Sequence, residues 1–215
     1  MQPPLLAFVS LVAAAAATAQ STVYDNTGGL APLDRGMLIH GSGATGFAKA
    51  GAMFIAPSDF TLDRVELGLW AVDNGTTVTA VTASLYTSFA TDGGDLPGTF
   101  LDSVTIAAPG SAPAYYTFDF ADTYSFTEGT KLWITLVNAT GTLVWSHNAA
   151  RIGGMQQQSF DPDPTLWNPG EEQNPQITLK VFAIPEPATS AILFGACGLI
   201  AVALYRRTSP PRKAA

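Results

Sequence analysis

Apolar side chains alternate with polar ones along much of the chain between Ser21 and Ile184. A step of two residues is typical of strands that bury one face and leave the other in water. The alternation is clearest at Val65, Leu67, Leu69 and Ala71; Val81, Ala83 and Leu85; Tyr116, Phe118 and Phe120; Leu132, Ile134 and Leu136; and Ile177, Leu179 and Val181. Between Ser21 and Ile184 the sequence shows no convincing helical period.

Glycine, aspartate and asparagine gather between these alternating stretches, at residues 73–75, 92–95, 109–111, 128–129 and 138–141. These residue types favour tight turns because they accept backbone angles that other residues avoid. Many short strands joined by tight turns predict an all-β fold, and specifically an antiparallel β-sandwich of the jelly-roll-like kind.

One of the turns can be assigned a type from its residues. In the segment 96–99, Pro97 suits the first central position and Gly98 suits the positive φ of the second. The sequence therefore predicts a type II turn that joins a strand ending near Tyr86 to a strand over 100–106.

Residues 1–19 are predicted to be a signal peptide that forms a short helix. They are apolar and rich in alanine, and Ala17-Thr18-Ala19 fits the small-residue pattern that signal peptidase cleaves, here before Gln20. The first four residues contain no Lys or Arg, so the α-amino group is the only positive charge there. Residues 20–184 then form a single predicted domain, which is long enough to bury a core.

The end of the chain has the pattern of a membrane-spanning tail. Residues 188–205 carry no charge and would rise about 27 Å as a helix, close to the thickness of the bilayer's hydrocarbon core. The segment 206–215 contains four basic residues and no acidic ones. By the positive-inside rule this basic segment lies in the cytoplasm and the preceding Pro185-Glu186-Pro187 lies outside.

Three features of this tail, in this order, resemble the PEP-CTERM sorting signal of Gram-negative and related bacteria. They are Pro185-Glu186-Pro187, the apolar helix and the pair Arg206-Arg207. The resemblance covers residues 185–215. It implies export, transient insertion in the inner membrane, and processing by an exosortase, after which the protein reaches the cell surface or the exopolysaccharide matrix. An ordinary membrane anchor is the alternative interpretation.

The body of the chain also resembles the choice-of-anchor β-sandwich domains that precede such signals. The shared features are the strand over 60–70, the 84–86 and 96–99 segments, the strand around 115–118, and the aromatic positions Trp133 and Trp145. This resemblance implies an architecture and a mode of anchoring, and it carries over no catalytic residues. The expected role is that of a structural or adhesive protein.

The charge of the predicted domain excludes some partners. Residues 20–184 contain six basic and sixteen acidic residues, a net charge of −10. Such a domain repels nucleic acid and anionic membrane surfaces. Cys197 is the only cysteine and lies in the apolar tail, so the exported domain cannot form an internal disulfide.

The sequence offers little that could carry catalysis. His40 and His147 are the only histidines, no G-x-S-x-G motif is present, and Ser42 lies in a glycine-rich loop. Ser146 precedes His147 directly, and neighbouring side chains of an extended chain point apart. We therefore predict that the protein is not an enzyme, with an extracellular hydrolase as the last of the alternatives.

Acidic residues form two weak candidates for a calcium site. Asp161, Asp163, Glu171 and Glu172 lie close in the sequence and supply the hard oxygen ligands that calcium prefers. Asp92 and Asp95 form a second group in a glycine-rich turn. Neither group has the spacing of a known calcium loop, so solvated acidic loops are the alternative, and no obligatory cofactor is expected.

A carbohydrate-binding, lectin-like module is the alternative to the structural role, with extracellular polysaccharide as the partner. Trp167 is the best candidate for stacking on a sugar ring because it lies in a polar loop near Asp161 and Asp163. Trp70 and Trp133 fall in apolar strands, where tryptophan is more often a core residue.

Overall fold

The computed structural model describes residues 21–41, 49–73, 75–92, 94–138, 140–148, 154–159, 171–173 and 177–184. These residues form thirteen strands: β1 Ser21–Asp25, β2 Gly36–His40, β3 Lys49–Ile55, β4 Phe60–Val72, β5 Ala80–Thr91, β6 Gly94–Ala107, β7 Ala114–Asp119, β8 Ser125–Phe126, β9 Lys131–Asn138, β10 Thr142–Ser146, β11 Gly154–Ser159, β12 Glu171–Gln173 and β13 Lys180–Ala183. The residues from Thr22 to Ala183 make up one compact unit.

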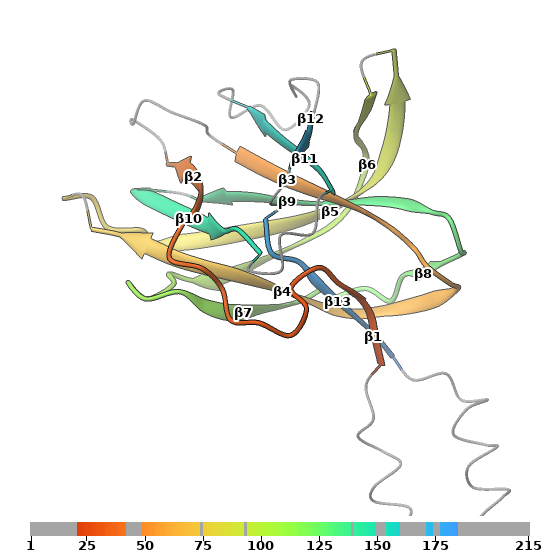
Figure 1. Ribbon diagram of the computed structural model, residues 1–215, viewed down its shortest axis with the longest axis horizontal. Helices are drawn as coiled ribbons and strands as arrows, with labels where there is room; N and C mark the ends of the chain where they lie inside the picture. The colour runs from red at the N-terminus through yellow and green to blue at the C-terminus, as the bar shows by residue number, and fades with distance from the viewer. Residues whose placement is uncertain are drawn as a thin grey trace, which may run out of the picture. The chain divides into compact units, whose positions relative to one another are not determined.

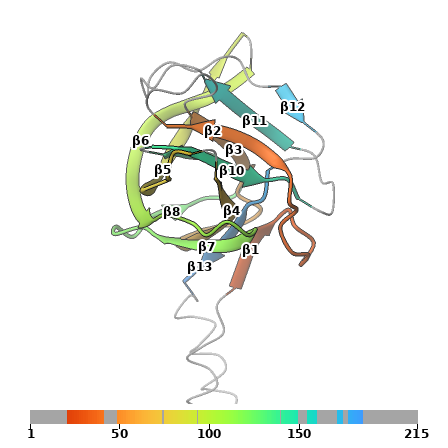
Figure 2. The ribbon, with the colours of Figure 1, turned by 90° about the vertical axis from the view of Figure 1, so that its left-hand side faces the viewer.

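The described strands divide between two sheets (Figure 1). Sheet A has the order β1-β13-β4-β10-β2, and β7 and β8 pair with the other edge of β4. Sheet B has the order β12-β11-β3-β9-β5-β6. The paired strands run antiparallel in both sheets, and the view in Figure 2 shows the sheets wrapped around a common interior. This confirms the prediction of an all-β, antiparallel, β-sandwich-like fold.

The alternating apolar residues of the sequence meet between the two sheets. On β4 of sheet A, Val65, Leu67 and Leu69 are fully buried, and on β9 of sheet B so are Ile134 and Leu136. All five belong to one hydrophobic cluster. Burying an aliphatic side chain of this size contributes about 1.5–3 kcal/mol, so this shared core is the main source of stability for a domain without disulfides.

The predicted type II turn at residues 96–99 is wrong. Pro97 and Gly98 lie within β6, and the chain reverses instead between Thr91 and Gly94, whose φ of 118° requires glycine. β6 is the edge strand of sheet B, which is the position in a sheet where proline is tolerated. The strand pairing is also irregular here, which accommodates the Pro-Gly pair without a turn.

The first and last strands of the domain are neighbours in sheet A. The backbone N–H of Asn26, just after β1, donates to the carbonyl of Leu179, just before β13. In both views the start of β1 and the end of β13 lie side by side (Figures 1 and 2). The chain therefore enters and leaves the domain at the same place.

The outer face of sheet A is covered by the connection between β1 and β2. Leu30 in this connection accepts a hydrogen bond from the hydroxyl of Tyr115 at 2.7 Å, and Leu33 accepts one from Ser146 at 2.7 Å. A Cβ at Gly68 would lie only 2.8 Å from Pro32, so glycine is needed for this close approach.

Candidate functional site

Most residues predicted to form a site lie outside the described residues. These are Trp167, Asp161, Asp163 and the sorting-signal residues Pro185, Glu186, Pro187, Arg206 and Arg207. The apolar segment 188–205 also lies outside them, and within the part of the chain that the structure describes there is no helix long and apolar enough to cross a membrane. These predictions therefore stay predictions.

Only two of the four residues in the first candidate calcium site lie among the described residues. Glu171 and Glu172 lie on β12, paired with β11 in sheet B, while their proposed partners Asp161 and Asp163 are not described. Among the described residues, no group of three or more His, Cys, Asp or Glu side chains is arranged to hold a metal ion.

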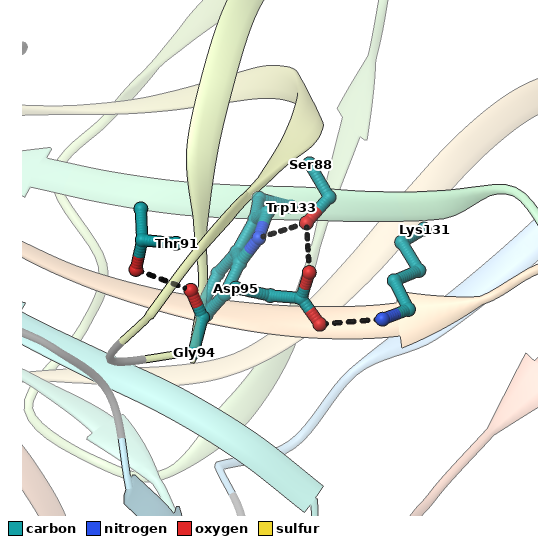
Figure 3. Close-up of polar contacts among 6 residues, drawn as sticks. All are labelled: Ser88, Thr91, Gly94, Asp95, Lys131 and Trp133. Carbon is teal, nitrogen blue, oxygen red and sulfur yellow. Dashed lines mark hydrogen bonds and ion pairs between the residues drawn. The ribbon is translucent and has the colours of Figure 1, made fainter.

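The second acidic group, Asp92 and Asp95, serves another purpose. The Asp95 carboxylate accepts a hydrogen bond from the Lys131 ammonium at 2.6 Å and another from the Ser88 hydroxyl at 3.3 Å (Figure 3). Both oxygens of this carboxylate are thus engaged by donors on β5 and β9, and these contacts anchor its own hairpin.

Trp133 completes this anchor. It is fully buried, yet it belongs to a small cluster with Met53 and Tyr86 that is separate from the core between the sheets. Its neighbours Leu132 and Ile134 point into the core, so alternation along β9 turns Trp133 to the outer face of sheet B. Its indole N–H donates to the Ser88 hydroxyl at 3.3 Å.

Together these residues tie the end of the β5–β6 hairpin to β9, the neighbouring strand of sheet B. The indole of Trp133 donates to Ser88, Ser88 donates to Asp95, and Lys131 donates to Asp95 (Figure 3). The hydroxyl of Thr91 closes the turn by donating to the Gly94 carbonyl at 2.7 Å. We call Ser88, Asp95, Lys131 and Trp133 the hairpin clamp. Its hydrogen bonds are directional, which suits a structural role.

The two histidines lie at opposite ends of the β2–β10 pair. The His40 ring bonds to the Thr142 hydroxyl at 3.1 Å, whereas the backbone N–H of His147 donates to the Arg35 carbonyl. Burial lowers the pKa of His147, and the neighbouring charge of Arg35 lowers it further. A general base supported by a carboxylate would have its pKa raised, so His147 lacks the electrostatic signature of a catalytic triad histidine.

The three described tryptophans are buried and offer no open ring for stacking. Trp145 is fully buried in the core, and its N–H donates to the Thr178 carbonyl at 2.7 Å. Trp70 is 9% exposed and faces outward from sheet A, opposite Val144. Trp70 and Trp133 are thus buried as predicted for core residues, but each lies outside the core between the sheets.

Two phenylalanines are the exposed aromatic residues that the sequence analysis missed. Phe89 is 60% exposed and Phe100 is 53% exposed, and both lie on the β5–β6 hairpin. The Phe100 ring meets Tyr86 edge to face, with 5.5 Å between ring centroids. The signal that could have revealed Phe100 is its place at the start of an alternating strand beside Tyr86.

No model of a known protein family matches the chain, and no curated protein matches it.

Proposed function

We propose that the protein is exported and displayed at the cell surface or in the exopolysaccharide matrix as a structural or adhesive component. The N-terminal segment 1–19 is a helix removed by signal peptidase. The helix 188–205 crosses the inner membrane once, until an exosortase processes the chain near Pro185-Glu186-Pro187. The β-sandwich between these segments is jelly-roll-like and is the displayed part.

The observation that supports this proposal best is the pairing of the first and last strands. Because β1 and β13 are neighbours and the chain enters and leaves at one place, both flanking segments can be handled by membrane enzymes without threading past the domain.

The composition of the domain is consistent with an extracellular protein. Its stability comes from packing between the sheets, which suits a domain that has no cysteine to form disulfides. Its acidic surface favours solubility and repels nucleic acid.

The proposal is tested by replacing Pro185-Glu186-Pro187 with three alanines and measuring where the protein accumulates. The matched control is Pro210→Ala with Pro211→Ala, which changes two prolines of the same tail outside the motif. We expect the triple variant to remain in the inner membrane at full length, while the control is delivered and processed like the wild type. Equal delivery of both variants would contradict sorting and leave an ordinary membrane anchor.

A further inference from the structure

The outer face of sheet B carries three rows of side chains that run across its strands. The strand registers align Trp133, Tyr86 and Phe100 in the first row, then Thr135, Ser84 and Ser103, then Val137, Thr82 and Thr105. Alternation along β5, β6 and β9 places all of these on the side away from the core. An aromatic row therefore lies directly beside two rows that are rich in hydroxyl groups.

The first two rows become more exposed toward β6, whereas the third row is exposed at both ends, at Val137 and at Thr105. Trp133 and Thr135 on β9 are buried, Ser84 and Thr82 on β5 are half-buried, and the three residues of β6 are exposed. We call Thr82, Ser84, Phe100, Ser103 and Thr105 the hydroxyl-aromatic face, and the exposed apolar Val137 of β9 adjoins it. Its hydroxyls are ordered in part, since those of Thr82 and Thr105 lie 2.8 Å apart.

Phe100 is positioned rather than loose. Its edge-to-face contact with Tyr86 fixes the ring on one side, while 53% of the residue stays in contact with water. Tyr86 is itself held in the cluster with Met53 and Trp133, beneath the clamped hairpin. A rigidly supported aromatic ring at the margin of a polar face loses little entropy when a ligand covers it.

The absence of charged side chains from this face favours a neutral ligand. The hydroxyl-aromatic face contains no ionised side chain. The neighbouring Asp102 carboxylate accepts hydrogen bonds from the backbone N–H groups of Ser103 and Ala121, and Lys131 and Asp95 pair with each other in the clamp. Lys49 continues the last row on β3, but it is 1% exposed. The predicted domain as a whole has a net charge of −10, which disfavours polyanions.

We propose that the hydroxyl-aromatic face binds a neutral polysaccharide. A sugar ring has an apolar face of C–H groups and a rim of hydroxyls. The C–H face can lie on Phe100, while the rim exchanges hydrogen bonds with Ser84, Ser103 and the threonine pair. The outer face of sheet A is unsuited to this because the β1–β2 connection covers it. The inference does not depend on the proposed export, because binding is measured on the purified chain and sorting in cells.

The test uses the full-length chain in detergent micelles. It is applied to an array of neutral glucans, mannans, xylans and galactans, with alginate as the anionic control, and the best neutral hit is then titrated by calorimetry. We expect a neutral hit, no alginate binding, and about tenfold or greater weakening by Phe100→Ala. Ser103→Ala should weaken binding by a smaller factor.

Phe89→Ala is the matched control for Phe100→Ala. Both phenylalanines are exposed on the same hairpin, but Phe89 follows Ser88, which points into the clamp, and so faces the other side. Phe89→Ala should bind like the wild type, and circular dichroism should show both variants folded.

The proposal is overturned if no neutral glycan binds, or if Phe89→Ala weakens binding as much as Phe100→Ala does. It is also overturned if Phe100→Ala only converts a dimer to a monomer in analytical ultracentrifugation, because the face would then be an interface between two copies of the chain.

Discussion

Trp145 and Trp133 are both fully buried, yet they belong to different parts of the molecule. Trp145 lies between the sheets, and its N–H donates to a backbone carbonyl at 2.7 Å. Trp133 lies outside the sandwich, and its N–H donates at 3.3 Å to Ser88, a residue of the hairpin that covers it. The first tryptophan belongs to the core that both sheets share, whereas the second ties the end of one hairpin to its neighbouring strand β9.

The core between the sheets and the layer over sheet B therefore depend on different contacts for their stability. The core between the sheets draws residues from strands throughout the domain, so it is expected to form and fail cooperatively. The layer over sheet B depends on a few contacts near the end of the β5–β6 hairpin. A region supported by so few contacts can open locally without unfolding the rest.

The largest effect is expected from Trp145→Ala. It removes a large side chain from the core and leaves the Thr178 carbonyl without its donor, which should lower the free energy of unfolding by about 3–5 kcal/mol. Trp133→Ala is the matched comparison and should cost about 2 kcal/mol, since the hairpin can move to fill the space. Urea denaturation followed by far-UV circular dichroism measures both. Equal losses would contradict the division into core and outer layer.

A smaller effect is expected from breaking the charged contact of the hairpin clamp. Asp95→Asn removes an ion pair whose Lys131 side chain is 45% exposed, so it should cost about 0.5–1 kcal/mol. Because salt screens exposed pairs, the difference from the wild type should shrink in about 1 M salt. Asp92→Asn, on the same turn, is the control and should be nearly neutral. A loss of several kcal/mol that salt does not change would show that Asp95 has another role.

The smallest effect concerns the pH dependence of stability. Because burial and Arg35 lower the pKa of His147, the unfolded chain binds a proton at this position more readily than the folded chain. Stability from this group is therefore present above the ordinary pKa of about 6.5 and is lost as pH falls through the lowered value. His147→Gln should make the thermal unfolding midpoint depend less steeply on pH between about pH 7 and 5 than it does in the wild type. An unchanged pH profile in His147→Gln would contradict the lowered pKa.

The sequence predicted the two sides of the sandwich to different degrees. Val65, Leu67 and Leu69 are inward-facing as expected, because period-two burial is a local property that one strand reveals by itself. The run from Leu132 to Val137 is apolar at nearly every position, a pattern typical of strands covered on both faces. This pattern could have shown that Trp133 is buried on the outer face of its sheet. Only the fold shows that Ser88 of the β5–β6 hairpin contacts it there.

The remaining errors have a common cause. Pro97-Gly98 has the composition of a turn, but its position on an edge strand lets both residues stay extended. The hydroxyl-aromatic face could not be derived either, because it is assembled by the registers of β9, β5 and β6 across the sheet. Strand order and register are long-range properties that no single stretch of sequence contains.

The division between core and outer layer is tested most directly by hydrogen exchange on the full-length chain, resolved to segments by mass spectrometry. In Trp133→Ala, the backbone amides of 87–100 should exchange markedly faster, while those of β4 and β10 keep the protection of the wild type. In Trp145→Ala, protection should fall throughout the described strands. Equal loss of protection in β4 and in the hairpin of Trp133→Ala would show that the outer layer and the core are one cooperative unit.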